Sequence, residues 1–265
     1  MLDRRLWIAS VFASLMAVSV LPNSVSAAQD DRVFELRTYV TNEGKLVDLL
    51  NRFRNHTCQL FEKHGIENIG YWVPLESAEG SENTLIYLIA HKSRSAAAAS
   101  WAAFGKDPDW QIARKASEFN GKILAKPPES VFLKATDYSP PVQTAVGTAE
   151  RVFELRTYRT PEGKLAALNS RFRDHTLNLF SRHGMAHIGY WTPDVANDAP
   201  APQTLIYILS HPSKEAGLKA FQSFRSDPDW IAAKAESEKD GSLTVPQPEG
   251  VKSLYLKATD FSPIR

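Results

Sequence analysis

The 265-residue sequence predicts an α+β protein made of two tandem ferredoxin-like repeats, each with the element order β-α-β-β-α-β. Three observations support this prediction. The heptapeptide that begins at Val33 recurs unchanged at Val152, and seven further shared motifs follow in the same order. Apolar residues alternate in four segments of each copy and recur at helical spacing between them. Each copy is about a hundred residues long, which is the size of a domain.

The first strand and the first helix follow directly from these patterns. Residues 33–40 alternate between the two faces of a strand and are rich in β-branched and aromatic side chains. Thr41 then offers an N-cap, and apolar residues recur at helical spacing from Leu46 to Phe61. The helix is expected to end at His64 and Gly65, because glycine readily adopts the left-handed conformation of a C-cap.

The remaining elements of the first copy complete the β-α-β-β-α-β order. We expect strands at 66–73, 84–91 and 131–138, and a broken second helix over 93–104 and 107–119. Such a sheet carries helices on one face only. The second copy can cover the other face by packing sheet against sheet, which makes one chain an internal pseudo-dimer.

The chain divides into four segments. Two arginines, an apolar stretch and a run of small residues predict a signal peptide at residues 1–28, and a retained membrane anchor is the alternative. The first repeat then covers 29–140, a small polar linker 141–150, and the second repeat 151–265. We therefore expect an exported, periplasmic or secreted protein that has no membrane span after the signal is removed.

Composition narrows the range of functions. The net charge is +1 and basic residues alternate with acidic ones, so no nucleic-acid surface is expected. Cys58 is the only cysteine and matches Leu177 in the second copy, which indicates a packing position rather than a catalytic thiol. Because the chain contains no metal-ligand spacing, phosphate loop, dinucleotide fingerprint or nucleophile elbow, we expect neither a metal nor a cofactor.

Polar residues on one face of the first strand of each copy are the candidate site. If Phe34 and Leu36 face the helices, the alternate residues face the space between the two sheets. By the same alternation, a tyrosine and a histidine of the third strand point into that space. Lys134 or Lys257 of the last strand is expected to point there as well. The ligand-binding candidates are Glu35, Arg37, Tyr39, Tyr87, His91, Glu154, Arg156, Tyr158, Tyr207 and His211. Two interpretations stay open: a structural network of ion pairs, and an interior that binds a small anionic ligand.

The shared motifs resemble those of the NIPSNAP family. They are Phe-Glu-Leu-Arg-Thr-Tyr, Gly-Lys-Leu, His-Gly, Gly-Tyr-Trp and Asp-Pro-Asp-Trp, and both copies contain all of them. The resemblance implies a dimeric α+β barrel, a superfamily that includes monooxygenases and haem-degrading enzymes, but it implies no particular reaction. We expect a protein that binds a small anionic or aromatic molecule in the barrel interior. The alternatives are a cofactor-free monooxygenase or isomerase and a non-catalytic protein-interaction module.

Overall fold

A computed structural model describes residues 30–147, 149–195 and 203–265, so the signal peptide expected at residues 1–28 lies outside the described part of the chain. The two repeats have the same order of elements. The first contains β1 (Val33–Val40), α1 (Leu46–Arg52), η1 (Phe53–Thr57), α2 (Cys58–Lys63), β2 (Glu67–Pro74), η2 (Ser77–Glu79), β3 (Thr84–His91), α3 (Arg94–Lys106), α4 (Pro108–Ser117) and β4 (Glu129–Ala135). The second contains β5 (Val152–Arg159), α5 (Leu165–Arg171), η3 (Phe172–Thr176), α6 (Leu177–Arg182), β6 (Ala186–Pro193), β7 (Thr204–His211), α7 (Lys214–Arg225), α8 (Pro228–Ser237) and β8 (Val251–Ala258).

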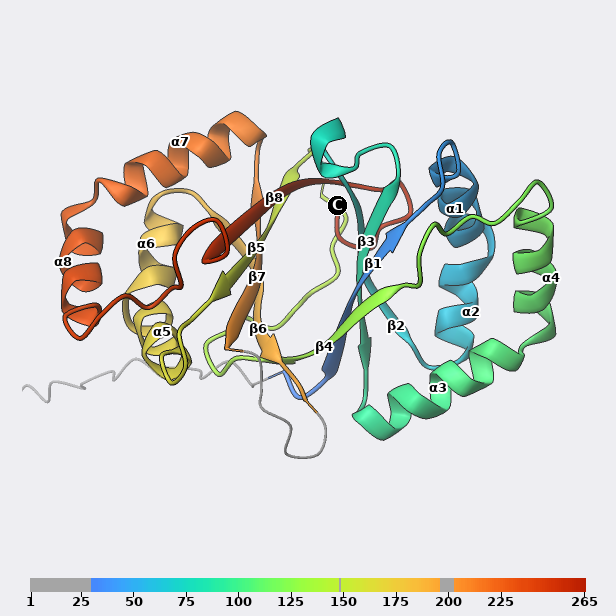
Figure 1. Cartoon of the computed structure of the whole chain (residues 1–265), viewed down its shortest axis with the longest axis horizontal. Coiled ribbons are helices and arrows are strands. Elements are labelled where there is room, and N and C mark those ends of the chain that lie inside the picture. Colours follow the sequence, from blue (N-terminus) through green and yellow to red (C-terminus); the bar gives the residue numbers. More distant parts are fainter. Residues whose placement is uncertain (1–29, 148, 196–202) are drawn as a thin grey trace, which may run out of the picture.

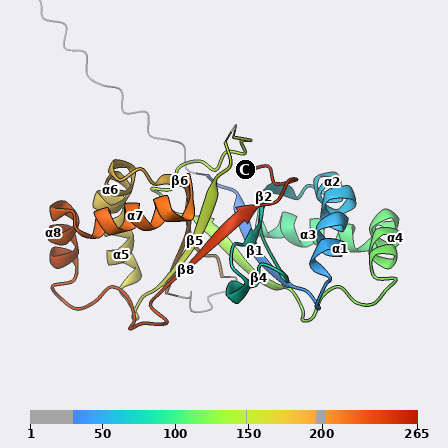
Figure 2. The same cartoon turned by 90° about the horizontal axis from the view of Figure 1, so that it is seen from above.

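The strands close into a single antiparallel barrel in the order β1-β3-β2-β8-β5-β7-β6-β4. Each repeat supplies four neighbouring strands, and two seams join the repeats. At one seam β2 pairs with β8, and at the other β4 pairs with β6. The barrel occupies the centre of the molecule, with the helices of each repeat at its own end (Figures 1 and 2). The α+β fold predicted from the repeats, an intramolecular version of a dimeric α+β barrel, is confirmed.

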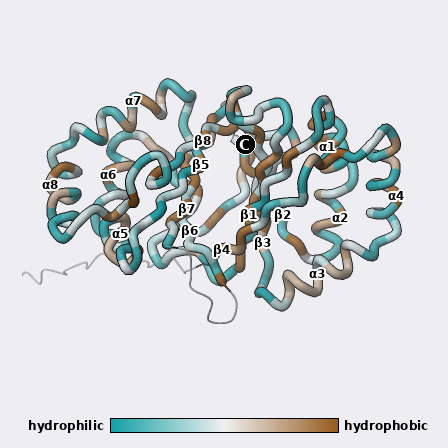
Figure 3. The backbone as a smooth tube through the Cα atoms, viewed as in Figure 1, coloured by the Kyte–Doolittle hydropathy of each residue, from teal (hydrophilic) through white to brown (hydrophobic). Residues whose placement is uncertain are grey.

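The barrel interior is apolar and tightly filled. Phe34 of β1 contacts the ring of Trp191 from the other repeat at 5.5 Å between ring centroids, and Trp72 contacts Phe153 at 5.6 Å. All four side chains are at most 1% exposed. Hydrophobic residues accordingly concentrate along the central strands, whereas the outer helices alternate between hydrophilic and hydrophobic positions (Figure 3). Packing across both repeats therefore stabilises the closed barrel.

The caps of the second helix follow the sequence prediction, and the first helix departs from it. The Ser93 and Asp107 side chains accept hydrogen bonds from backbone N–H groups at the starts of α3 and α4, as expected. Thr41 is not an N-cap, because it forms an isolated bridge with Leu124, and α1 begins after Lys45. The first helix also contains a π-helical turn, in which the Thr57 hydroxyl donates to the Arg52 carbonyl.

The tail that follows the last strand of each repeat crosses to the other repeat. Arg54 of the first repeat forms a bidentate ion pair with Asp260, at 2.7 and 2.6 Å. Arg173 and Asp137 form the equivalent pair in the opposite direction. Phe53 lies in the π-helical turn of the first repeat, and its ring stacks with that of Phe261 at 6.5 Å between ring centroids. Each repeat therefore supports the first helix of its neighbour.

None of the helices within the described ranges is long and apolar enough to cross a membrane.

Candidate functional site

The polar face of the first strand does not lie in the barrel interior, which corrects the sequence prediction. The predicted alternation along β1 is right, but Phe34 and Leu36 belong to the apolar core between the repeats. Glu35, Arg37 and Tyr39 point to the opposite side, toward the helices of their own repeat. Charged groups are tolerated there because Trp101 of α3, His91 of β3 and Ser130 of β4 provide hydrogen-bond partners, whereas the core between the repeats is built of hydrophobic side chains.

Glu35 is the centre of a buried network in the first repeat and is 1% exposed. One carboxylate oxygen accepts hydrogen bonds from Arg37 and from Ser130, the latter at 2.5 Å. The other lies 3.1 Å from His91 Nε2 and accepts from Trp101 Nε1 at 2.8 Å. Burial opposes ionisation, but the His91 contact, the charge of Arg37 and the two remaining donors lower the pKa of Glu35 to about 2.

The second repeat builds the same network around Glu154 with one exchange of donor. Arg156 and Ser253 donate to Glu154 at 2.5 Å, and His211 Nε2 lies 3.0 Å from it. Phe221 occupies the place of the indole donor and carries no polar atom. Tyr255, which replaces a phenylalanine of the first repeat, instead brings a hydroxyl to Glu154. The replacement of one donor by another is typical of a structural network that keeps its carboxylate satisfied.

The candidate tyrosines lie beside these networks, again on the helix side. Tyr39 and Tyr87 contact each other at 5.2 Å between ring centroids, and Tyr158 and Tyr207 do so at 5.5 Å. Burial raises the pKa of Tyr87 and of Tyr207 well above the ordinary value, so both hydroxyls stay protonated. The structure therefore brings the candidate residues together within each repeat, but as two separate clusters rather than as one shared interior.

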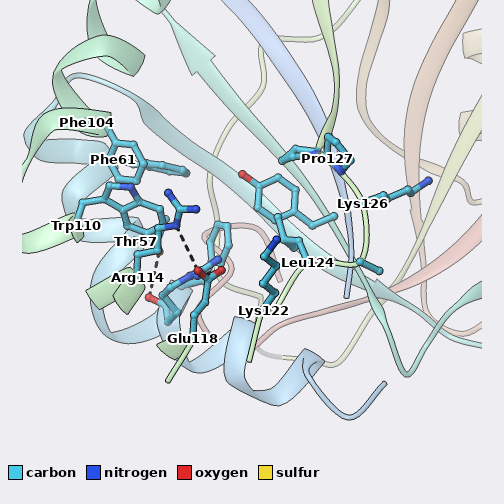
Figure 4. A pocket seen from close by; sticks show the side chains of 15 residues that line it. Thr57, Phe61, Phe104, Trp110, Arg114, Glu118, Lys122, Leu124, Lys126 and Pro127 are labelled. Atoms are coloured by element: carbon cyan, nitrogen blue, oxygen red, sulfur yellow. Dashed lines mark hydrogen bonds and ion pairs between the residues drawn. The ribbon is translucent and has the colours of Figure 1, made fainter. Parts of the chain in front are cut away.

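A pocket opens beside the first cluster, between the helices and the segment that leads into β4. Its volume is about 570 Å³, and Tyr39 is the candidate residue that lines it. Phe61, Phe104 and Trp110 lie on one side of the pocket, and Leu124 and Pro127 lie on the other (Figure 4). The full lining is Tyr39, Arg52, Phe53, Thr57, Phe61, Phe104, Trp110, Arg114, Glu118, Lys122, Leu124, Ala125, Lys126, Pro127 and Pro128.

Arg52 is the buried cation of this pocket, with its side chain 3% exposed. Its Nη1 donates to Ser117 at 3.2 Å and lies 3.6 Å from Glu118, while its Nε has no hydrogen-bond partner among the described residues. The guanidinium lies 5.2 Å from the centre of the Trp110 ring. Burial lowers the pKa of Arg52 more than the nearby carboxylate raises it. The pocket thus contains an incompletely paired positive charge on an aromatic floor.

The rim of the pocket is also positive. Arg114, Lys122 and Lys126 surround the opening, and Glu118 is the one carboxylate among the lining residues. Arg114 lies 3.4 Å from Glu118, and Lys126 pairs with Glu129 outside the pocket. Three cationic side chains, those of Arg52, Arg114 and Lys122, therefore share the single carboxylate of the lining, which favours a negatively charged ligand.

The second repeat keeps a cation at the position of Arg114, which is Lys234, but lacks the two lysines of the loop. Backbone hydrogen bonds from Ala125 to Val40 and from Val245 to Arg159 align the two loops. Ser242 and Pro246 then stand where the first repeat has lysines. The buried arginine of the second repeat also pairs more closely with its glutamate, at 2.8 Å. Charge distinguishes the two repeats at this position.

Most of the pocket could not be recognised from the sequence. Arg52 lies in an Arg-Phe-Arg motif that both copies share, and nothing in that motif indicates that its guanidinium lines a pocket. Lys122 and Lys126 carried a usable signal, because they differ between copies that otherwise agree. In the part of the chain that the structure describes, no three His, Cys, Asp or Glu residues are grouped so that they could hold a metal ion.

A closed barrel of two ferredoxin-like repeats, with a pocket between one sheet and its helices, defines a fused α+β barrel protein. The chain belongs to the NIPSNAP family, whose profile matches residues 34–140 and 153–263. No curated protein is significantly similar to it in sequence.

Solved structures show the same fold at low sequence identity. A protein from Lactobacillus acidophilus NCFM, provisionally named a monooxygenase, is 13% identical; the match covers 86% of this chain and 94% of that chain, with a TM-score of 0.53. An anthrone oxidase-like protein is 12% identical over 90% of this chain and 96% of that chain, with a TM-score of 0.53. A NIPSNAP family protein from Agrobacterium tumefaciens str. C58 is 19% identical and covers 45% of this chain and 97% of that chain, with a TM-score of 0.36. The first two similarities show the fold alone.

Proposed function

We propose that the first repeat binds a small aromatic anion in the pocket between its sheet and its helices. The observation that carries this proposal is the combination of an aromatic floor with an excess of positive charge. Pockets of about 300–1,000 Å³ with apolar walls and a few polar groups are typical of small-molecule sites. The pocket of about 570 Å³ has this size and composition.

The lining assigns a role to each part of such a ligand. An aromatic ring would lie against Phe61, Phe104 and Trp110, which offer both ring faces and ring edges. A carboxylate would lie near Arg52, where a bidentate hydrogen bond could satisfy the unpartnered guanidinium nitrogen. Lys122 at the rim would add electrostatic attraction and speed the approach of an anion.

The cofactor-free oxygenase or isomerase is the second candidate, and the lining favours it less. Proton abstraction from a substrate needs a base within hydrogen-bond reach. Glu118 is the one carboxylate of the lining and already lies close to two arginines, and none of the lining residues is a histidine. The interaction-module alternative predicts that no small molecule binds. Binding without turnover is therefore the function that the geometry supports best.

Isothermal titration with 2-naphthoate tests the proposal, with neutral 2-naphthamide as the matched ligand. We expect naphthoate to bind and naphthamide to bind at least several-fold more weakly, because only the former carries a charge. Replacing Lys122 and Lys126 together by Ser should weaken naphthoate binding about tenfold, since each cation contributes roughly 0.5–1 kcal/mol.

The control variant replaces Lys115 and Lys239 by Ser, two exposed lysines outside the pocket lining. It loses the same net charge and should bind naphthoate as the unmodified chain does. Equal affinity for naphthoate and naphthamide, or equal losses in the two double variants, would remove this pocket from the proposal.

Export and the monomeric state belong to the same proposal. The sequence of residues 1–28 supports export, and N-terminal sequencing of the protein from the extracytoplasmic fraction should find a start near Gln29. Because one chain closes the barrel, light scattering should give the mass of a single chain; a dimer that persists on dilution would contradict this.

A further inference from the structure

A serine, a histidine and a tyrosine form a connected group in the second repeat, away from the positive pocket. Ser181 Oγ on α6 lies 2.8 Å from His187 Nε2 on β6. His187 Nδ1 lies 2.6 Å from the hydroxyl of Tyr190, a residue that is fully buried. The Phe180 ring lies nearly parallel to the imidazole, at 6.4 Å between ring centroids. A nucleophile, a base and a group that orients the base are thus within hydrogen-bond reach of one another.

The first repeat has different chemistry at the same place. There Asn68 Nδ2 donates to Glu62 at 3.0 Å and to the Cys58 carbonyl at 2.9 Å, and the Tyr71 hydroxyl donates to the Asn68 amide oxygen. The second repeat keeps the tyrosine but replaces the glutamate by Ser181 and the asparagine by His187. Two side chains in contact have therefore changed together, from an amide and a carboxylate to an imidazole and a hydroxyl.

The pair opens into its own pocket of about 380 Å³. Leu177 and Tyr138 provide an apolar wall, and Asn178 lies three residues before Ser181 on the same helix face. Asp137 faces the pocket from the tail of the first repeat and is ion-paired with Arg173. The pocket suits a small, uncharged substrate with an apolar group.

The protonation state of the imidazole suits a base. Burial lowers the pKa of His187, against a smaller opposing contribution from the Leu177 carbonyl, so the ring is neutral near pH 7. Both ring nitrogens of His187 have a hydroxyl partner, and the tautomer decides which of them donates. Removal of the serine proton requires the tautomer with its proton on Nδ1, in which Nε2 accepts from Ser181.

We infer that Ser181 is a nucleophile toward small carboxylic esters, with His187 as its general base. Ser181 Oγ forms a bond to the ester carbonyl carbon while its proton moves to His187 Nε2. The ester C–O bond then breaks, and the alcohol leaves with that proton. Water, deprotonated by His187, hydrolyses the acyl-serine to the carboxylic acid and restores the hydroxyl. Asn178, which also lines this pocket, offers a side-chain amide as a candidate donor to the oxyanion.

Labelling with a fluorophosphonate and p-nitrophenyl acetate tests this inference on the full chain. Trypsin releases Ser181 in the peptide of residues 174–182, which contains no other serine, so mass spectrometry locates the adduct unambiguously. We expect fluorophosphonate labelling of this peptide and release of p-nitrophenol above the buffer rate. Both should disappear in Ser181→Ala, which changes an exposed residue and leaves folding intact.

His187→Asn is the decisive variant, because the first repeat already accommodates asparagine at this place. It should lower labelling of Ser181 at least tenfold while thermal unfolding followed by circular dichroism stays cooperative. Absence of an adduct on the 174–182 peptide, or labelling unchanged in His187→Asn, would overturn the inference. Neither outcome depends on the naphthoate site of the first repeat.

Discussion

Replacing Arg37 by Met tests whether the buried network of the first repeat stabilises the fold. Arg37 is the cation next to Glu35, and its guanidinium lies 4.6 Å from the Trp101 ring. Methionine keeps much of the volume but leaves Glu35, which is 1% exposed, without a neutralising charge. The lowering of the Glu35 pKa from 4.5 to about 2 corresponds to roughly 3 kcal/mol of stabilisation of the carboxylate. Removing one partner of a buried ion pair typically costs about 3–5 kcal/mol.

Urea unfolding at pH 7, followed by tryptophan fluorescence and circular dichroism, measures this cost. We expect Arg37→Met to lower the free energy of unfolding by about 3 kcal/mol. Glu35→Gln with Arg37→Met should cost less than the sum of the single changes, because no buried charge is then left unpaired. A loss below about 1 kcal/mol for Arg37→Met, or strict additivity in the cycle, would refute the reasoning.

The same network gives the direction of the pH dependence. Because the pKa of Glu35 is lowered in the folded state, its contribution to stability is complete above about pH 4.5 and is lost as the pH falls toward 2. The pKa of Glu154 is lowered as well, so it contributes with the same sign. Stability should therefore fall steeply between pH 5 and pH 2, and Glu35→Gln should make that decline shallower. An unchanged slope would contradict the assignment.

Three further predictions concern single positions. Trp101→Phe should lower the free energy of unfolding by about 1–2 kcal/mol, because it removes a hydrogen-bond donor to the buried carboxylate of Glu35. Adding Phe132→Tyr should recover part of this loss in urea unfolding, because the second repeat has a tyrosine at that position. Gly70→Ala should destabilise the fold by at least about 1–3 kcal/mol, since its Cβ would lie 2.1 Å from a tryptophan ring. Gly105→Ala, in open space within α3, should instead stabilise it by about 0.5–1 kcal/mol. Equal melting temperatures for the two variants would contradict both predictions. Burial raises the pKa of Cys58 to about 12. Ellman's reagent at pH 8 should therefore modify this thiol far more slowly in the folded chain than in urea. Rapid modification of the folded chain would show that the thiol is accessible.

The fold could be predicted from the sequence because the two copies confirm each other. Alternation along residues 33–40 and the caps at Ser93 and Asp107 are local signals, and each appears in the structure. The face of β1 was assigned wrongly, because both faces of this strand are covered and alternation does not show which cover is apolar. Phe34 packs between the repeats, where contacts come from residues more than a hundred positions away.

The candidate site was predictable only in part. Glu35, Arg37 and His91 do meet, since neighbouring strands and a shared parity bring them together. The pocket itself depends on how residues 122–128 pack against α4, and periodicity carries no information about such a loop. The group at Ser181 and His187 was equally hidden, because each residue is unremarkable until the fold places the helix beside the strand.

The position of β8 has a consequence for biosynthesis. This strand closes one seam of the barrel by pairing with β2, and it is the last strand to leave the ribosome. At about 5–20 residues per second, translation from the end of β4 to the end of β8 takes on the order of ten seconds. Until the second repeat folds, the nascent first repeat exposes Phe34, Trp72 and the unpaired edges of β2 and β4 to solvent. A holding chaperone is therefore expected to bind this chain while its second half is being made.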